Sequence, residues 1–535
     1  MRVSHSIMLV TLLVTTLLTG CSKDWSGRDL SGKDYSGRDL TGHILVGTTL
    51  AGANLSGANL DFSLLEEANL SGANLRGASL LRTSTSGMNL AGADLAGANL
   101  EETDLRGILA RDASFEGANL RGADLSGVDL SGVNLRNADL AGANLRSSML
   151  TGADLAGANL TGARLGQANL DEAILTGATL DDTVFAGAIL TRVDLSEMDL
   201  SGVDLSGADL TSADLSAATL DSADLTGATL SRANLAGASL VGTRLRNTDL
   251  SGQRLRSLPM ARADFRGATL TRTQFNDADL SGAIFRQATL ERTTFNGANL
   301  TGASLHRATV DRAQFADATL NEIDFSGATL SLLDLRNLDM ARANFSDATL
   351  TGVSLAGAML EHAQFRSVAM PNAFLAGTRL HQADFANANL AGATLSEADL
   401  SSAIFRSANL EGASFREAQV AGADFHSANL TRANLSDADF SSTNVHFATL
   451  VALEFTDETR WPDAFDRRAY EHAELRREVR EANDAIEREV RAILEPIVDI
   501  IEDEQDRTRE YESCVRSRVL EGLSTERAHV VCLRR

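Results

Sequence analysis

Large apolar residues recur at every fifth position over most of the chain. The register passes through Leu30, Leu120 and Leu300 and ends at Phe455 without an insertion. We call each of these apolar positions the centre of a unit. The residue two before the centre is usually Ala, and the residue directly before it is usually Asp, Asn or Thr. Gly often stands two positions after the centre. Residues 26–455 therefore form 86 consecutive units of five residues.

A period of five fits neither a strand, which repeats every two residues, nor a helix, which repeats every 3.6. Frequent Gly would also cost a helix about 1 kcal/mol per residue relative to Ala. One large inward residue, one small inward residue and a polar corner describe one side of a coil. The pattern resembles the pentapeptide repeat family, whose motif is A(D/N)LXX. The resemblance implies an all-β solenoid, a right-handed quadrilateral β-helix with four units per coil and about 21 coils for 86 units.

Residues twenty positions apart have the same chemistry, which supports four units per coil. One Phe column contains Phe265, Phe285, Phe325, Phe345, Phe365, Phe385, Phe405 and Phe425. A second column, ten residues out of phase, contains Phe275, Phe295 and Phe315. A threonine ladder contains Thr269, Thr289, Thr309, Thr329 and Thr349. With coils stacked about 4.8 Å apart, we expect the Phe columns to form the core of a rod on the order of 100 Å long.

Both ends of such a rod need covering. In the first coil, the small inward position is occupied by Arg28, Lys33, Arg38 and His43. Four bulky polar residues need partners inside a narrow coil, so we expect this coil to be open or frayed and regular coils to begin near residue 47. After Phe455, segment 456–468 resembles the exit segment of bacterial pentapeptide repeat proteins. The resemblance implies that Trp461 and Phe465 cap the last coil.

The sequence of the tail, residues 469–535, predicts helices. Its apolar residues are spaced four, three, four, four, three and four apart, as in an amphipathic helix. They are Leu475, Val479, Ala482, Ile486, Val490, Ile493 and Ile497. Pro496 should kink or divide this helix. The apolar seam could pack on a neighbouring helix or on the rod, or it could dock a partner, including a second copy in a homodimer.

Two cysteines lie symmetrically about a turn in the tail. Cys514 stands eight residues before Gly522, and Cys532 stands eight residues after Ser524. Gly522 can end one helix and Ser524 can cap the next, so a helical hairpin would bring the cysteines together. In an exported protein we expect a disulfide. No His or Cys stands at metal-ligand spacing, so we expect no metal.

The N-terminus has the layout of an export signal, with Arg2, an apolar run from Ile7 to Leu18 and small residues after it. The segment ends in Leu-Thr-Gly-Cys21, which resembles the lipobox of bacterial lipoproteins. A simple secretory signal with a chance cysteine is the alternative. The resemblance implies a signal peptide over 1–20, lipidation of Cys21, an anchor linker over 21–25 and attachment in the cell envelope, with Ser22 favouring the outer membrane.

The surface is acidic, with a net charge of −24. Phosphate binding needs clustered cations, so direct nucleic-acid binding is not expected. The many Asp residues follow the repeat and are read as a solvated face rather than as acid/base pairs, and the serines lack a nucleophile motif. A basic stripe beside the Phe column either pairs with nearby Asp or binds an acidic partner or lipopolysaccharide phosphate. It contains Arg246, Arg266, Arg286, His306, Arg366 and Arg406.

These features favour a non-catalytic, lipid-anchored extracytoplasmic scaffold without a cofactor. Its solenoid faces and helical tail would bind an unidentified protein or envelope component. The family resemblance raises an alternative, a DNA-mimicking protector or inhibitor of DNA gyrase. The acidic charge suits mimicry, but an export signal would separate the protein from gyrase.

Overall fold

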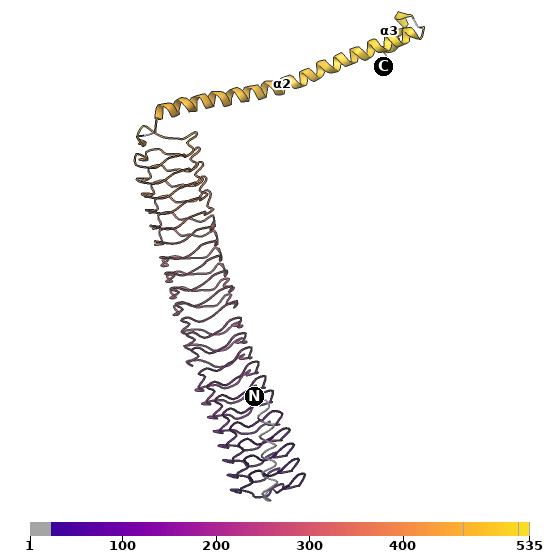
Figure 1. Cartoon of the computed structure of the whole chain (residues 1–535), viewed down its shortest axis with the longest axis vertical. Helices are drawn as coiled ribbons and strands as arrows, with labels where there is room; N and C mark the ends of the chain where they lie inside the picture. Colours follow the sequence, from indigo (N-terminus) through magenta and orange to yellow (C-terminus); the bar gives the residue numbers. More distant parts are fainter. Residues whose placement is uncertain (1–22, 464, 523, 534–535) are drawn as a thin grey trace. The chain divides into compact units, whose positions relative to one another are not determined.

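The computed structural model describes residues 23–463, 465–522 and 524–533. The chain divides after Arg460 into a repeat unit and a C-terminal unit. In the repeat unit, bends of the backbone follow one another every five residues and the coils stack into a rod (Figure 1). The five-residue period of the sequence is therefore a period of turns.

Most turns are closed by a backbone hydrogen bond across three residues. The Ala53 amide, for example, donates to the Leu50 carbonyl over 3.0 Å. The residue between them, Gly52, has φ +62°. A turn with a positive φ at its third residue favours Gly because Gly lacks a Cβ. At the same position of other turns Asn337 and His362 adopt φ values near +60°, so the fold tolerates side chains at many corners.

Adjacent coils pair in parallel with a register of twenty residues. The bridges begin with Asp24 and Ile44 and continue at the equivalent positions along the rod. Where Thr residues stack, the pairing extends into a four-stranded parallel sheet, ordered β1-β2-β3-β4. Its strands are β1 (Thr289–Glu291), β2 (Thr309–Asp311), β3 (Thr329–Ser331) and β4 (Thr349–Thr351). The register of Thr289 with Thr309 confirms the predicted threonine ladder.

The Phe columns form stacked rows in the core, as predicted. Phe345 lies between Phe325 and Phe365, with ring centroids 5.1 Å and 4.9 Å away. In the second column, the centroids of Phe275 and Phe295 are 5.3 Å apart. All these rings are fully buried. Because each coil supplies only a narrow layer of core, stability comes from contacts between neighbouring coils.

Many buried hydroxyls at the small inward position bond to the preceding coil, while others, such as that of Thr248, bond within their own turn. The Thr243 hydroxyl donates to the Leu220 carbonyl over 2.7 Å, and the Thr293 hydroxyl donates to the Leu270 carbonyl over 2.8 Å. Each replaces a usual Ala with a polar group whose hydrogen bond is made inside the rod. These buried polar side chains are therefore part of the scaffold.

The prediction that the first coil is open or frayed was wrong. The Trp25 amide donates to the Ile44 carbonyl over 2.8 Å, and the same pairing continues around the coil. Arg28, Lys33 and Arg38 are exposed, while His43 is buried beside the Trp25 ring at 5.2 Å. The three long cations stay exposed because the described residues form no coil before this one, so the backbone stays regular.

Some bulky residues at the small inward position coincide with breaks in the ladder. Bridges are missing between 179 and 199, between 234 and 254, and between 319 and 339. These breaks adjoin Met198, Gln253 and Leu338, where other units mostly have Ala. A larger inward side chain in a close-packed interior pushes neighbouring coils apart.

The repeat pattern continues slightly beyond Phe455. Asp439 pairs with Arg460, twenty-one residues later, so one extra residue is inserted in this last coil. The Thr459 hydroxyl donates to the Leu435 carbonyl over 3.1 Å, as buried hydroxyls do in regular units. The five-residue pattern did not predict this unit, because the inserted residue shifts the unit by one position from the pattern.

The C-terminal unit contains two helices, α2 (Arg467–Leu520) and α3 (Thr525–Cys532). Helix α2 runs through Pro496 without a break, so the proline does not divide it. Gly522, with φ +90°, lies between the helices, and Ser524 is the N-cap residue of α3. The predicted helical hairpin is therefore present.

Candidate functional site

The aspartates that precede the centres bind the turns of the rod. Asp194, Asp199, Asp204, Asp209 and Asp214 each accept a hydrogen bond from the backbone amide two residues later. Asp214 also accepts from the Ser216 hydroxyl at 2.6 Å and from the Asn234 amide group at 3.0 Å. These bonds, with the Ser216 hydroxyl first, lower the pKa of Asp214. These five carboxylates serve as hydrogen-bond acceptors in the turns of the rod.

Most arginines of the predicted basic stripe pair with aspartates of the same rod. Arg246 and Arg266 both contact Asp264, each at 2.6 Å. Arg366 pairs with Asp384 at 2.6 Å, and Arg406 pairs with Asp424. Of the two readings of the stripe, the geometry favours local pairing at these positions.

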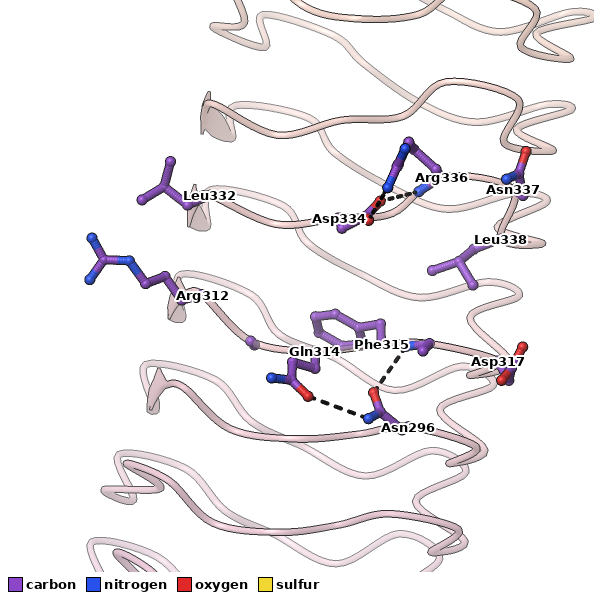
Figure 2. Close-up of a pocket in the computed structure, with 12 residues that line it drawn as sticks. Asn296, Arg312, Gln314, Phe315, Asp317, Leu332, Asp334, Arg336, Asn337 and Leu338 are labelled. Atoms are coloured by element: carbon purple, nitrogen blue, oxygen red, sulfur yellow. Dashed lines mark hydrogen bonds and ion pairs between the residues drawn. The ribbon is translucent and has the colours of Figure 1, made fainter.

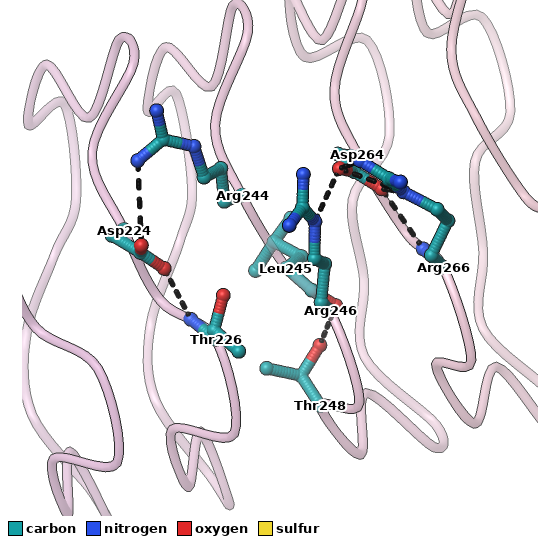
Figure 3. A network of polar contacts seen from close by, with 8 residues as sticks. All are labelled: Asp224, Thr226, Arg244, Leu245, Arg246, Thr248, Asp264 and Arg266. Carbon is teal, nitrogen blue, oxygen red and sulfur yellow. Dashed lines mark hydrogen bonds and ion pairs between the residues drawn. The ribbon is translucent and has the colours of Figure 1, made fainter.

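Asp264 is the most buried carboxylate in these pairs, with 8% of its side chain exposed. Figure 3 shows Arg246 and Arg266 converging on it from two coils. Burial raises the pKa of Asp264, but the hydrogen bonds from Arg266 and Arg246 outweigh burial and hold the pKa below its ordinary value. A neighbouring pair, Arg244 and Asp224, is looser at 3.3 Å.

Two members of the stripe lie outside this pairing. Arg286 is exposed and forms no ion pair with any residue that the structure describes. His306 is half-buried, and its Nδ1 lies 2.8 Å from the Ser326 hydroxyl. Among the described residues of the stripe, Arg286 is thus the one arginine without an ion pair, and the stripe is not a continuous row of unpaired cations.

The ion pairs follow a spacing rule that the sequence contains but that was missed. An Arg directly after a centre pairs with an Asp eighteen residues later, in the next coil. The rule is seen in Arg76–Asp94, Arg121–Asp139, Arg136–Asp154, Arg246–Asp264, Arg366–Asp384 and Arg406–Asp424. Arg286 has Ser304 at that spacing, which explains why it lacks an acidic partner there.

A groove of about 660 Å³ opens on the rod near Leu338. Figure 2 shows two contacting pairs among its polar side chains, Asn296 with Gln314 and Arg336 with Asp334. The Asn296 side chain bonds Gln314 at 3.4 Å and the Ala316 amide at 3.1 Å, and Arg336 pairs with Asp334 at 2.7 Å. We attribute the groove to the local spreading of coils beside Leu338. These four polar side chains bond in pairs and do not converge on a ligand position.

Within the part of the chain that the structure describes, no group of three or more His, Cys, Asp or Glu residues could hold a metal ion. The described helices also include none that is long and apolar enough to cross a membrane. Cys21, the predicted lipidation site, lies outside the described residues. Its modification stays a prediction.

The tail carries a confirmed disulfide and an uncovered apolar seam. Cys514 and Cys532 are joined, linking α2 to α3. The Tyr511 hydroxyl contacts the His529 Nδ1 at 2.6 Å, so α3 lies against the C-terminal third of α2. In the seam, Leu475 and Ile486 are more than half exposed.

The predicted capping residues contact each other. The rings of Trp461 and Phe465 are stacked, with centroids 4.0 Å apart. Phe465 also lies near Tyr470, at 5.7 Å between centroids. These contacts order the start of the C-terminal unit. That the two residues cap the last coil stays a prediction.

Two family models match the repeat unit. Pentapeptide repeats (8 copies) matches overlapping segments from 36 to 252, and the pentapeptide repeat region model matches 268–345, 288–365 and 378–455. The chain belongs to the pentapeptide repeat family. This assignment agrees with the turns every five residues and with the stacked Phe core.

Solved pentapeptide repeat structures resemble parts of the chain. HetL, involved in heterocyst differentiation regulation in the cyanobacterium Nostoc sp. strain PCC 7120, is 29% identical, with 50% of this chain and 94% of HetL covered and a TM-score of 0.19. Full-length QnrB1, a plasmid-mediated fluoroquinolone resistance protein, is 16% identical, with 48% and 94% covered and a TM-score of 0.18. No curated protein matched the sequence.

Proposed function

We propose that this pentapeptide repeat protein is a non-catalytic scaffold, anchored by lipid at Cys21 in the bacterial cell envelope. It presents the solenoid faces and the helical tail to a protein or envelope component. The observation that carries the proposal is that most of the polar side chains discussed above form hydrogen bonds or ion pairs within the rod itself. Its aspartates bind turns, many of its buried hydroxyls bond the preceding coil, and its paired arginines bond the next coil.

The anchor is supported by the sequence around Cys21, and Ser22 favours the outer membrane. For the rod we infer right-handed quadrilateral coils, about 21 in number for 86 units, as the family resemblance implies. Such a rod would be on the order of 100 Å long. Two or more acyl chains at Cys21 would anchor the protein firmly, because one chain alone binds a bilayer only marginally.

Metabolic labelling tests the anchor. Labelled palmitate should enter the wild-type protein and be absent from Cys21→Ala, while the matched variant Ser22→Ala should still be labelled. The wild type should fractionate with envelope membranes. An unlipidated protein in the cytosol would contradict the scaffold proposal.

Proximity labelling identifies the surface that meets the partner. The full chain, carrying a labelling enzyme on the rod, is compared in envelope membranes with a chain that ends after Phe465. If the neighbours disappear on truncation, the tail carries the interaction. If they persist, the rod carries it, and an absence of specific neighbours in both would contradict a scaffold.

A further inference from the structure

Within the C-terminal unit, no other described element covers the apolar seam of α2. Leu475, Val479, Ile486, Val490 and Ile493 are between 48% and 60% exposed. The helix α3 is joined to α2 at Cys514, well beyond the seam. A helix in a folded protein gains most of its stability by packing an apolar face against a neighbour. We therefore expect a seam of this length to have a partner.

The seven seam residues lie along one narrow side of α2. At about 100° per residue, all of them fall within about 40° of the direction of Ile486. From Leu475 to Ile497 the seam is about 33 Å long. A straight stripe of this kind matches another helix along its whole length.

The spacing of the seam is symmetric about Ile486. Leu475 and Ile497 stand eleven residues before and after it, Val479 and Ile493 seven, and Ala482 and Val490 four. A second copy of α2 related by a two-fold axis at Ile486 and running in the opposite direction would place each seam residue at the height of another. The seam is therefore complementary to itself in the antiparallel direction.

The charges along α2 distinguish the two directions. Residues 467–480 contain five Arg and three Glu, a net charge of +2, whereas residues 492–505 contain five acidic residues and no Arg or Lys, a net charge of −5. An antiparallel pair centred on Ile486 sets these segments side by side. A parallel pair sets each −5 segment beside its copy, which is unfavourable at separations near 10 Å.

We propose that α2 pairs with α2 of a second copy of this chain in an antiparallel dimer centred on Ile486. The proposal deepens the proposed function by giving the helical tail its partner, so each assembly would carry two repeat units. It does not depend on the anchor. Loss of palmitate labelling with an intact dimer would overturn the anchor alone.

The mass of the full chain, purified in detergent, tests the pairing. Sedimentation equilibrium should give a dimer for the wild type. Ile486→Asp sets two carboxylates against each other at the two-fold axis and should weaken association at least 10-fold. Ala473→Asp is the matched control, because it adds the same charge on the side of α2 away from the seam, and it should stay dimeric. A monomeric wild type, or equal behaviour of the two variants, would overturn the proposal.

Disulfide mapping tests the direction. After mild oxidation, a mixture of Val479→Cys and Ile493→Cys chains should form the mixed disulfide, because these positions face each other in the antiparallel pair. Val479→Cys alone should crosslink poorly, since its two copies would be about 21 Å apart along the pair. Efficient crosslinking of Val479→Cys to itself would establish a parallel pair and overturn the proposal. Monomers that bind lipid vesicles through the seam would overturn it in favour of a membrane surface.

Discussion

At the residue scale, the core depends on a few large rings that stack along the rod. Phe345 contacts Phe325 and Phe365 in adjacent coils at interplanar angles of 22° and 2°. Its ring is completely buried. Because a solenoid core is only one coil deep, a ring lost from one layer cannot be replaced by side chains from elsewhere.

Phe345→Ala should destabilise its own coil and both neighbours by about 3–5 kcal/mol, the usual range for removing a buried ring. A long repeat array does not unfold in two states, so hydrogen exchange of individual coils is the appropriate measurement. The amides around Phe325 and Phe365 should exchange faster, whereas coils near Leu120 should not change. Phe374→Ala removes a ring that is 61% exposed and should change little. Equal effects of the two variants would contradict the stacked core.

Residue positions in the coil could be predicted because inward and outward sites follow from a fixed count of five and twenty. The partners of outward side chains were harder to predict. Arg266 stands in the same column as Arg286, yet the first bonds Asp264 and the second is exposed. That difference depends on which residue stands two positions before or eighteen positions after each Arg. The column in which an Arg stands does not by itself determine whether that Arg has an acidic partner.

At the element scale, some large residues at the small inward position lie beside gaps in the pairing of neighbouring coils. The Asn144 amide bonds the Ala123 carbonyl at 2.9 Å, with Ala143 fully buried beside it. Near Leu338 the pairing is looser: the Leu320 amide lies 3.3 Å from the Asp339 carbonyl, whereas the Leu125 amide lies 2.8 Å from the Asn144 carbonyl. The groove of Figure 2 is lined in part by Leu338, beside this break.

Ala143→Leu should create such a break in a regular part of the rod. Overpacking typically costs about 1–3 kcal/mol, because side chains and backbone must shift to accept the extra volume. Hydrogen exchange at the Asn144 amide should accelerate. Ala236→Leu adds the same volume at an exposed corner and should leave exchange near the wild-type rate. An unchanged Asn144 amide would show that inward volume does not control pairing.

The C-terminal elements show what local sequence can and cannot predict. The hairpin and the Cys514–Cys532 disulfide were predictable, because Gly522 and Ser524 are strong end and start signals for helices. The effect of Pro496 was not. A proline removes one backbone hydrogen bond but does not always end a helix, and α2 continues past it.

At the scale of the whole molecule, the two ends of the repeat unit differ in chemistry. The last coil continues through Thr459 to Arg460 and is followed by the C-terminal unit. The first coil is regular, so its outer edge presents backbone groups that bond no preceding coil in the described chain. Such an edge can template the addition of another chain, and charged residues are a common protection. Arg28, Lys33 and Arg38 stand where other coils have Ala.

A triple variant in which Arg28, Lys33 and Arg38 are each replaced by Ala should therefore self-associate through the first coil. The parent for the test is Cys21→Ala, so that no lipid lies near this end. The triple variant should associate end to end with rising concentration, because an apolar, unpaired edge then meets its copy without burying charge. Light scattering should report the larger mass, and negative-stain electron microscopy should show rods joined at their N-terminal ends.

A second triple variant separates charge from position. Arg146, Arg256 and Arg286 are exposed on the sides of the rod, and replacing them with Ala removes the same number of cations. This variant should keep the mass of the parent, because its solenoid edge is still protected. If both variants associate equally, lost net repulsion is the cause and the first coil has no protective role. If neither associates, the regular edge is protected by something other than these three cations.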